Sequence, residues 1–351
     1  MSLKEIRKNI DSIDSQIMQL LNNRMEQVLL AKKFKSEIED NEREKEVLDR
    51  IEKNATDLIN SEFMEKVYAE IIRESKRLQQ NNFEIIAFQG EHGAYSEVAS
   101  REWNRDLIPF PCITFAEVFE GVQTGLYEYG IVPVENTLGG SVAQVNHLLI
   151  DTDLNVVGAI ELPVHHCLLS LPGTDHREIR NVYSHPQALS QCRRFLQRNK
   201  LEPLSFSDTA GAAKMLAEKR PKQTAAIASR LSAKLYNLEI MKEKVEDLDR
   251  NMTRFLVLSK EESEEEGDKC SIVFATEHKA GTLFNVLHAF AKKDISLTRI
   301  ESIPNEPGDY AFFLDFEGSS KNNKVVEALK EVKRITTNFR LMGCYKERRA
   351  K

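Results

Sequence analysis

Residues 3–38 read LKEIRKNIDSIDSQIMQLLNNRMEQVLLAKKFKSEI, and this stretch decides the architecture of the N-terminal region. Its aliphatic residues recur at spacings of three and four, which keeps one face of a helix apolar: Ile6, Ile10, Ile13, Ile17, Leu20, Val28 and Ala31. One helix over this stretch would be on the order of 50 Å long, more than a small domain covers. We therefore expect a second chain to bury this face, in a homodimer or a larger homo-oligomer.

Two cations lie on the same apolar face. Arg24 and Lys35 fall within about 20° of its centre, and a cation on a buried face is unfavourable unless an anion meets it. The anion is either a protein carboxylate in a coiled-coil dimerisation arm or a ligand in a pocket. Arg7 lies about 25 Å along the helix from Arg24, so it could reach such a pocket only from the partner subunit of an antiparallel dimer.

The composition restricts the class of protein. The chain has 351 residues, enough for two or three domains. A net charge of −6 gives no support for a nucleic-acid or membrane partner, and no apolar run reaches the roughly 18 residues that a membrane span needs. The N-terminus lacks the pattern of a signal peptide. The five cysteines are scattered without metal-ligand spacing, so we expect reduced core residues in a cytoplasmic protein.

Three regions differ in their patterns. Residues 1–82 contain neither glycine nor proline and predict three helices. Residues 83–260 alternate short apolar strands with helices, which is typical of an α/β region. The acidic segment 261–268 is a linker. Residues 269–351 predict the order β-α-β-β-α-β of a ferredoxin-like α+β domain.

The first region resembles the all-helical chorismate mutase family, whose intertwined dimers convert chorismate to prephenate. The resemblance implies a chorismate-binding site that receives Arg7 from the partner subunit. The other positions that match the family's site lie within one chain: Arg24, Lys35, Asp40, Arg43, Glu44, Ser75 and Gln79. Ser75 and Gln79 are four residues apart and therefore share a helix face.

These residue types suit the rearrangement of chorismate. Chorismate is a dicarboxylate that cations can anchor, arginine by paired hydrogen bonds. The reaction needs no nucleophile, acid or base, but it needs the coiled conformer and stabilisation of the charge that develops on the ether oxygen. By the resemblance, Lys35 and Gln79 serve that oxygen as catalytic residues. Asp40 and Glu44 would hold the hydroxyl end of the ring and position the cations.

Four segments of the second region resemble prephenate dehydratase, whose fold is two α/β lobes around a cleft, like that of periplasmic binding proteins. The segments are FQGEHGAYS (88–96), VPVENTLGGS (132–141), YSHPQALSQC (183–192) and NMTRF (251–255). Two of them follow apolar strands, where α/β sheets place ligand groups. The first lobe is expected at about 83–163 plus 246–260, with the second lobe between these two segments.

In this family prephenate loses its C4 hydroxide and its ring carboxylate, which gives phenylpyruvate, water and carbon dioxide. The protein must donate a hydrogen bond or proton to the departing hydroxyl and orient the carboxylates. We expect Thr253 to be the catalytic donor, with a relay as the alternative because a threonine hydroxyl is a weak acid. The other expected prephenate contacts are Glu135, Asn136, Ser184, His185, Gln191 and Arg254.

Some of these positions also have a structural interpretation. His185, and likewise His166, can close the end of a strand by hydrogen bonding. Glu135 can act as a cap rather than as a ligand contact. Asp208 stands where some relatives have glutamate, and its shorter side chain weakens any role in the site.

The third region resembles an ACT domain, which in this family binds phenylalanine at a dimer interface for feedback inhibition. The resemblance implies phenylalanine contacts from Gly281, Thr282, Leu283, Glu301 and Ser302. Gly281 at a helix N-terminus suits the close approach of a ligand carboxylate. An arginine usually precedes the proline of the second motif, and Ile303 stands there in this chain.

Together the resemblances predict a bifunctional, cytoplasmic enzyme of phenylalanine biosynthesis, at least dimeric and without a metal or organic cofactor. The main alternative is an amino-acid-sensing protein built from the same domains. Such a sensor has no need for Arg7, Arg24, Lys35 and Gln79 at once. A secreted solute-binding protein would carry a signal peptide ahead of the two-lobed region.

Overall fold

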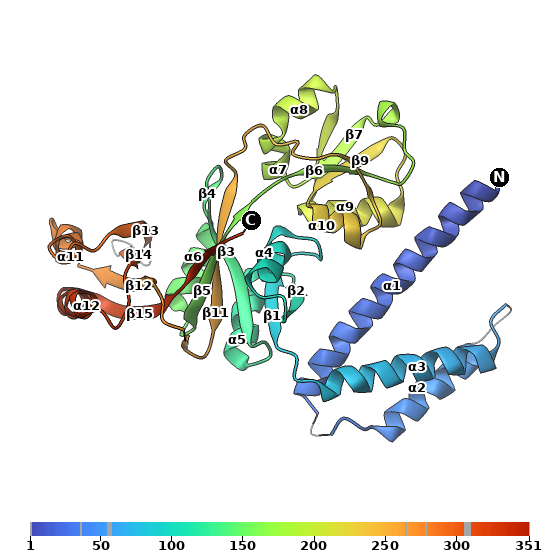
Figure 1. Cartoon of the computed structure of the whole chain (residues 1–351), viewed down its shortest axis with the longest axis horizontal. Coiled ribbons are helices and arrows are strands. Elements are labelled where there is room, and N and C mark those ends of the chain that lie inside the picture. Colours follow the sequence, from blue (N-terminus) through green and yellow to red (C-terminus); the bar gives the residue numbers. More distant parts are fainter. Residues whose placement is uncertain are drawn as a thin grey trace. The chain divides into compact units, whose positions relative to one another are not determined.

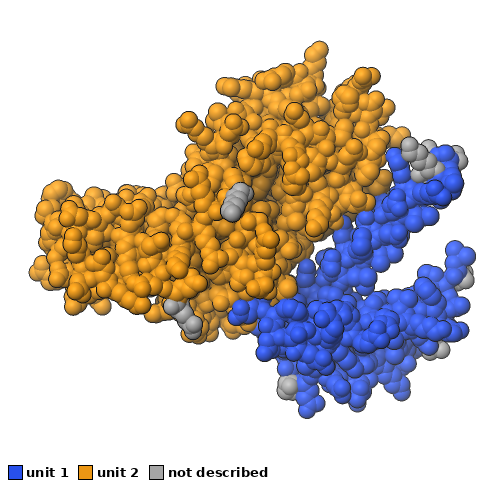
Figure 2. Space-filling view, in the orientation of Figure 1, with its two compact units in different colours: residues 1–84 blue, residues 85–351 orange. Residues whose placement is uncertain are grey.

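The computed structural model describes six stretches of the chain: residues 2–35, 37–54, 58–263, 265–277, 279–304 and 310–350. The chain divides into two compact units, Met1–Glu84 and Ile85–Lys351 (Figure 2). None of the helices in the described stretches is both long enough and apolar enough to cross a membrane.

The first unit consists of three helices (Figure 1): α1 (Leu3–Lys33), α2 (Asn41–Asn54) and α3 (Ser61–Gln80). The C-terminal half of α1 contacts α3, and its N-terminal half extends away from the other two helices. The apolar face of that extended half is open to solvent in the single chain, since Ile10 and Ile13 are 50% and 55% exposed.

Helix α1 ends at Lys33, earlier than the sequence pattern predicted. Helix α2 begins at Asn41, so Lys35 lies between the two helices. The expectation that Lys35 lies on the long helix is therefore wrong. Lys35 belongs to the connection between α1 and α2.

The second unit begins with a sheet in the order β16-β5-β11-β3-β1-β2, in which β4 also pairs with β3. The strands of this first lobe are β1 (Ile85–Gln89), β2 (Ile108–Cys112), β3 (Tyr129–Asn136), β4 (Gly140–Ser141), β5 (Asn155–Pro163), β11 (Met252–Ser259) and β16 (Glu347–Arg349). Its helices are α4 (Tyr95–Trp103), α5 (Phe115–Thr124) and α6 (Ala143–Asp151). Ile86, Ala87 and Phe88 of β1 are fully buried, as a central strand covered on both faces requires.

The second lobe contains a sheet in the order β10-β6-β9-β7-β8. Its strands are β6 (Cys167–Ser170), β7 (Asn181–Ser184), β8 (Glu202–Ser205), β9 (Thr224–Ala228) and β10 (Glu239–Lys242). Its helices are η1 (His176–Glu178, a 3-10 turn), α7 (Pro186–Gln191), α8 (Arg193–Arg198), α9 (Thr209–Lys219) and α10 (Arg230–Leu235). The two-lobed α/β architecture predicted from the sequence is confirmed.

Two chain segments connect the lobes, residues 164–166 after β5 and residues 243–251 before β11. They are hydrogen-bonded to each other: the amide of Val164 donates to the carbonyl of Asn251 at 2.8 Å, and the amide of Val245 donates to the carbonyl of His166 at 3.0 Å. The side chains on these segments therefore lie between the two lobes.

The C-terminal region has the element order β-α-β-β-α-β that its sequence predicted. Its elements are β12 (Lys269–Thr276), α11 (Thr282–Ala291), β13 (Leu297–Pro304), β14 (Tyr310–Glu317), α12 (Asn323–Ile335) and β15 (Thr337–Tyr345). The strands form one antiparallel sheet in the order β13-β14-β12-β15. The chain then returns to the first lobe, because β16 pairs in parallel with β5, a strand that the sequence pattern missed.

One disulfide corrects the expectation that all five cysteines are reduced. Cys270 and Cys344 form a disulfide, because they lie directly opposite each other on the neighbouring strands β12 and β15. Cys112, Cys167 and Cys192 are free thiols and buried, as expected. Burial raises the pKa of the Cys112 and Cys167 thiols to about 11 in each case, so both remain protonated at neutral pH.

Candidate active sites

In the first unit, three of the expected chorismate contacts lie together where α1 meets α3. Arg24 donates from Nη1 to the hydroxyl of Ser75 at 2.6 Å. Gln79, one turn further along α3, donates from Nε2 to the carbonyl of Val28 at 2.9 Å. Ser75 and Gln79 are each 7% exposed. The acceptor of this hydrogen bond is a neutral hydroxyl, so the arginine remains able to pair with an anion.

The connection after α1 brings a second group of expected residues together. Lys35 Nζ lies 3.1 Å from a carboxylate oxygen of Asp40. The backbone amide of Arg43 donates to the other oxygen at 3.0 Å. This amide, together with Lys35, lowers the pKa of Asp40 below its usual value. The carboxylate of Asp40 thus positions the ammonium group of Lys35.

The two expected site residues on α2, Arg43 and Glu44, form ion pairs within the unit. Glu44 pairs with Lys76 of α3 at 2.6 Å, a partner that the sequence analysis did not identify. Arg43 pairs with Glu46, one turn further along its own helix, at 2.8 Å. Arg7 is exposed and lies far along α1 from this cluster, as the helix geometry predicted.

In the second unit, Asn136 and Thr253 occupy paired positions on the adjacent strands β3 and β11. The amide nitrogen of Asn136 donates to the hydroxyl oxygen of Thr253 at 2.9 Å. The same nitrogen donates to the side-chain oxygen of Asn251 at 2.8 Å, and Asn251 in turn donates to the side-chain oxygen of Gln191 at 3.0 Å. Three expected prephenate contacts, Asn136, Gln191 and Thr253, therefore belong to one hydrogen-bonded group.

Two expected contacts from the second lobe have structural roles. The hydroxyl of Ser184 is fully buried and donates to the carbonyl of Ile227 at 2.6 Å. The hydroxyl proton is therefore bonded inside the sheet, and the expected contact of Ser184 with prephenate stays a prediction. The Nδ1 atom of His185 accepts the backbone amide of Gln187 at 3.3 Å and caps α7, which is the structural alternative for this histidine.

Glu135 and Arg254 lie on the other face of the sheet from Asn136 and Thr253, because adjacent residues of a strand point to opposite faces. The guanidinium of Arg254 binds Asp315 of β14 and Glu347 of β16, each at 2.5 Å. Glu135 lies 3.8 Å from the guanidinium of Arg299 on β13. Both side chains face the C-terminal region, and their expected contacts with prephenate stay predictions.

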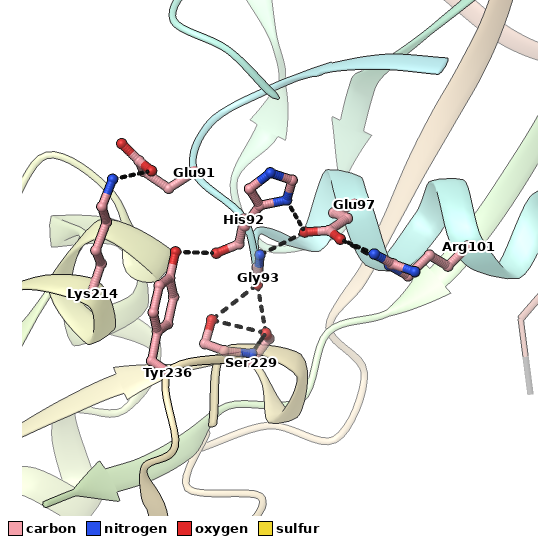
Figure 3. A network of polar contacts seen from close by, with 9 residues as sticks. Glu91, His92, Gly93, Glu97, Arg101, Lys214, Ser229 and Tyr236 are labelled. Carbon is pink, nitrogen blue, oxygen red and sulfur yellow. Dashed lines mark hydrogen bonds and ion pairs between the residues drawn. The ribbon is translucent and has the colours of Figure 1, made fainter. Parts of the chain in front are cut away.

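The loop after β1 is hydrogen-bonded to the second lobe (Figure 3). The carbonyl of Gly93 accepts the hydroxyls of Ser229 at 2.6 Å and Ser232 at 3.1 Å. Tyr236 donates its hydroxyl to the carbonyl of His92 at 2.8 Å. Gly93 has φ +92°, and a Cβ there would lie 2.4 Å from the hydroxyl of Ser232, so only glycine fits this contact.

Two ion pairs support the same loop. Lys214 of the second lobe pairs with Glu91 at 2.9 Å. Glu97 of α4 is fully buried and accepts the amide of Gly93 at 2.7 Å and the guanidinium of Arg101 at 2.6 Å. Burial would raise the pKa of Glu97, but its bonds to His92, Gly93 and Arg101 outweigh burial and lower it. The loop is thus held by a charged carboxylate on its own lobe and by hydroxyls of the other lobe.

The expected phenylalanine contacts lie on two elements of the C-terminal sheet domain. Gly281 precedes α11 with φ +87°, and a Cβ there would meet nothing within 4 Å. Thr282 donates its hydroxyl to the carbonyl of Lys279 at 3.0 Å. Glu301 and Ser302 lie on the edge strand β13, and Ile303 of that strand is buried.

Fold and sites together define a class of protein: a three-helix unit with a cationic cluster, joined to a two-lobed α/β unit with a polar group at its hinge. Two family models match the chain, chorismate mutase type II over residues 6–80 and prephenate dehydratase over residues 86–263. The chain belongs to the bifunctional chorismate mutase/prephenate dehydratase family. It is an enzyme of phenylalanine biosynthesis that carries both catalytic domains.

Known relatives agree with this assignment. The bifunctional chorismate mutase/prephenate dehydratase of Aquifex aeolicus is 34% identical, and the match covers 98% of this chain and 97% of that protein. Arogenate dehydratase/prephenate dehydratase 6 of Arabidopsis thaliana is 40% identical over 74% of this chain and 68% of that protein. The prephenate dehydratase of Arthrobacter aurescens in complex with L-Phe is 27% identical, with a TM-score of 0.70 over 75% of this chain and 89% of that one.

Proposed function

We propose that the mutase site is completed only in a dimer. Arg24 and Lys35 of one subunit hold the two carboxylates of chorismate, and Arg7 of the partner subunit closes the site. The observation that carries this proposal is the open apolar face of α1, where Ile10 and Ile13 are half exposed in the single chain. Burying that face in a second copy is favourable, and in an antiparallel arrangement it brings the partner's Arg7 to the cluster.

The residues of this site have different roles in the rearrangement. Lys35, positioned by Asp40, and the second N–H of Gln79 stabilise the negative charge that develops on the ether oxygen as its bond to carbon breaks. Glu44 binds the hydroxyl end of the ring. No residue exchanges a proton with the substrate, because the rearrangement only redistributes the electrons of the breaking and forming bonds.

For the dehydratase reaction, Thr253 donates to the departing C4 hydroxyl. The observation that carries this role is the direction of its contact with Asn136: the threonine oxygen accepts a hydrogen bond from the amide, so its own proton is available to the substrate. As the C4–O bond breaks, the hydrogen bond from Thr253 stabilises the departing hydroxide. The carboxylate departs as carbon dioxide, and its bonding electrons complete the aromatic ring.

The C-terminal region acts as a phenylalanine sensor of the ACT type. The solved relative that contains L-Phe supports phenylalanine binding. The open space at Gly281, at the start of α11, admits a carboxylate close to the helix N-terminus. Thr282, Leu283, Glu301 and Ser302 would form the rest of that site, with a second copy across the edge strand β13.

Two variants of the full chain test whether the mutase and dehydratase reactions use separate sites. We expect Lys35→Ala to remove mutase turnover and to leave the dehydratase unchanged, and Thr253→Ala to do the reverse. Turnover of chorismate and of prephenate is measured separately, with and without millimolar phenylalanine. Loss of both activities in a folded single variant would refute the separate sites, and an unchanged dehydratase rate at millimolar phenylalanine would refute the sensor.

A further inference from the structure

The hydrogen-bonded group that holds Thr253 continues through the hinge between the lobes. The ring of His166, on the first connecting segment, lies between Tyr95 of the first lobe and Gln191 of the second. Its Nδ1 is 2.7 Å from the hydroxyl of Tyr95, and its Nε2 is 2.8 Å from the side-chain oxygen of Gln191. His166 is 2% exposed, so its partners are those of the protein.

The direction of every bond in this group follows from one residue. The side-chain oxygen of Asn136 accepts the backbone amides of Leu138 at 3.1 Å and Gly139 at 2.7 Å. A backbone amide can only donate, so this end of the Asn136 side chain must be the oxygen and the other end the nitrogen. The nitrogen therefore faces the side-chain oxygens of Asn251 and Thr253, at 2.8 and 2.9 Å, and the carbonyl of Met252 at 3.1 Å. Its two hydrogens are donated among these three acceptors.

The orientations of the Asn251 and Gln191 side chains follow from that of Asn136. Because Asn251 accepts from Asn136 with its oxygen, its nitrogen must donate to Gln191. Gln191 accordingly presents its oxygen both to Asn251 and to His166. Its Nε2 has no hydrogen bond to the protein within the described stretches of the chain, so that group is available to donate to a substrate.

The orientation of the Gln191 amide also determines which ring nitrogen of His166 carries the proton. Only an N–H can face the oxygen of Gln191, so the proton is on Nε2. Burial lowers the pKa of His166, and the ring is neutral at pH 7. A neutral imidazole has a single N–H, so Nδ1 is an acceptor that faces the hydroxyl of Tyr95. That hydroxyl also lies 2.8 Å from the carbonyl of His165, so its one proton is shared between these two acceptors.

We propose that His166, oriented by Tyr95, is a positioning residue of the dehydratase that keeps the Gln191 amide and the Thr253 hydroxyl directed toward the substrate. The inference deepens the proposed role of Thr253 and depends on it. His166 acts only through other side chains. Its N–H prevents the Gln191 amide from turning over, and a reversed Gln191 would force Asn251 to abandon its bond with Asn136. The group is complete only when both lobes contribute, so it forms with the cleft in the arrangement seen here.

Two substitutions of His166 by amides of similar size test whether the residue positions Gln191 or only fills space. Glutamine can place an amide nitrogen near the position of Nε2, whereas the shorter asparagine places its amide near Nδ1. We expect His166→Gln to keep the dehydratase kcat within about threefold of the natural chain, and His166→Asn to lower it by about tenfold or more. KM for prephenate should change less than kcat, and mutase turnover in the same chain should not change. Equal kcat values for the two variants, high or low, would overturn the proposal.

Two tyrosines with hydrogen-bonded hydroxyls, Tyr95 and Tyr236, provide a matched pair. Tyr95→Phe removes the hydroxyl that faces Nδ1 of His166 and the carbonyl of His165, and it should lower the dehydratase kcat by about threefold to tenfold. Tyr236→Phe removes a hydroxyl of the second lobe that bonds to the carbonyl of His92, and it should leave kcat unchanged. Equal losses from the two variants would show a general effect of weakened lobe contact and refute the specific role of His166.

A spectroscopic measurement is independent of activity and of variant folding. Nitrogen-15 NMR of the natural chain should show His166 as the neutral form with its proton on Nε2, and a proton on Nδ1 would contradict the proposal. The Thr253→Ala variant distinguishes a failure of the proposed Thr253 role from a failure of the proposed His166 role. If it keeps dehydratase activity, the proposed role of Thr253 fails. If it is inactive while His166→Asn is fully active, only the positioning role of His166 fails.

Discussion

The guanidinium of Arg254 binds the carboxylate of Asp315, and the two groups join strand β11 of the first lobe to strand β14 of the C-terminal domain. Asp315 is fully buried and Arg254 is 8% exposed. Burial would lower the pKa of Arg254, but Asp315, Tyr345 and Glu347 outweigh burial and raise it above its usual value. Since Thr253 is the preceding residue on β11, the proposed sensor is tied directly to the strand that carries the proposed proton donor.

Removing the cation of this pair should destabilise the second unit. We expect Arg254→Met to lower the free energy of unfolding by about 3–5 kcal/mol, because Asp315 is left buried without its cation. Denaturant unfolding measures the loss, and the combined Arg254→Met/Asp315→Asn variant should lose less than the sum of the two single changes. A higher KM for prephenate with unchanged stability would instead support the carboxylate-anchoring role that the sequence indicated.

A charge in place of the Asn136 amide should disable the dehydratase alone. In Asn136→Asp one carboxylate oxygen still accepts the amides of Leu138 and Gly139, but the other now faces the hydroxyl of Thr253 as an acceptor. It binds the proton that the substrate needs, so kcat should fall by about a hundredfold. Mutase turnover of the same preparation is the control. A dehydratase rate close to that of the natural chain would contradict the direction of the bond between Asn136 and Thr253.

Mixing two inactive mutase variants should restore activity if the site spans two subunits. Arg7→Ala and Arg24→Ala each damage every site of their own homodimer. In a mixed dimer both changes fall on one site and the other site is intact. After unfolding and refolding an equal mixture, we expect about one quarter of the natural mutase activity. A mixture no more active than its components would show that Arg7 does not act across the subunits.

The buried carboxylate of Glu97 should make stability depend on pH. Because its pKa in the folded chain is lowered from the ordinary value of 4.5, the ionised group stabilises the fold above that value, and the stabilisation is lost as the pH falls through the lowered pKa. Glu97→Gln should therefore cost about 1–3 kcal/mol near pH 7 and progressively less below pH 4.5. Glu102→Gln, an exposed change on the same helix, should have little effect at any pH. A loss from Glu97→Gln that is constant with pH would refute the role of its charge.

The disulfide predicts a definite thiol count. A denatured, unreduced chain should show three reactive thiols, from Cys112, Cys167 and Cys192. Reduction of the Cys270–Cys344 bond should lower the free energy of unfolding by about 2–4 kcal/mol, because the bond restricts the unfolded chain. Five reactive thiols in the unreduced chain would show that the two cysteines are opposite each other but not bonded.

Much of the architecture could be predicted from the sequence because it depends on local patterns. The apolar face of residues 3–38, the alternation of strands and helices, and the β-α-β-β-α-β order each follow from periodicity within a few turns or strands. The cluster of Arg24, Ser75 and Gln79 was predicted from the resemblance to chorismate mutases, and the spacing of Ser75 and Gln79 placed those two residues on one helix face. The motif around Asn136 and Thr253 carried enough residues to indicate its chemistry before any contact was known.

The tertiary structure alone decided which members of those motifs face the site. Thr253 and Arg254 are neighbours in the chain, yet the alternation of a strand sends one to the hinge group and the other to Asp315. The sequence does not show which face of β11 meets which domain, because that depends on pairing with β3 and β5 and on the return of β16. In the same way, the contact of His166 with Gln191 and the bond between Cys270 and Cys344 join residues distant in sequence. Sheet register and hinge geometry bring them together, and neither is a local property of the chain.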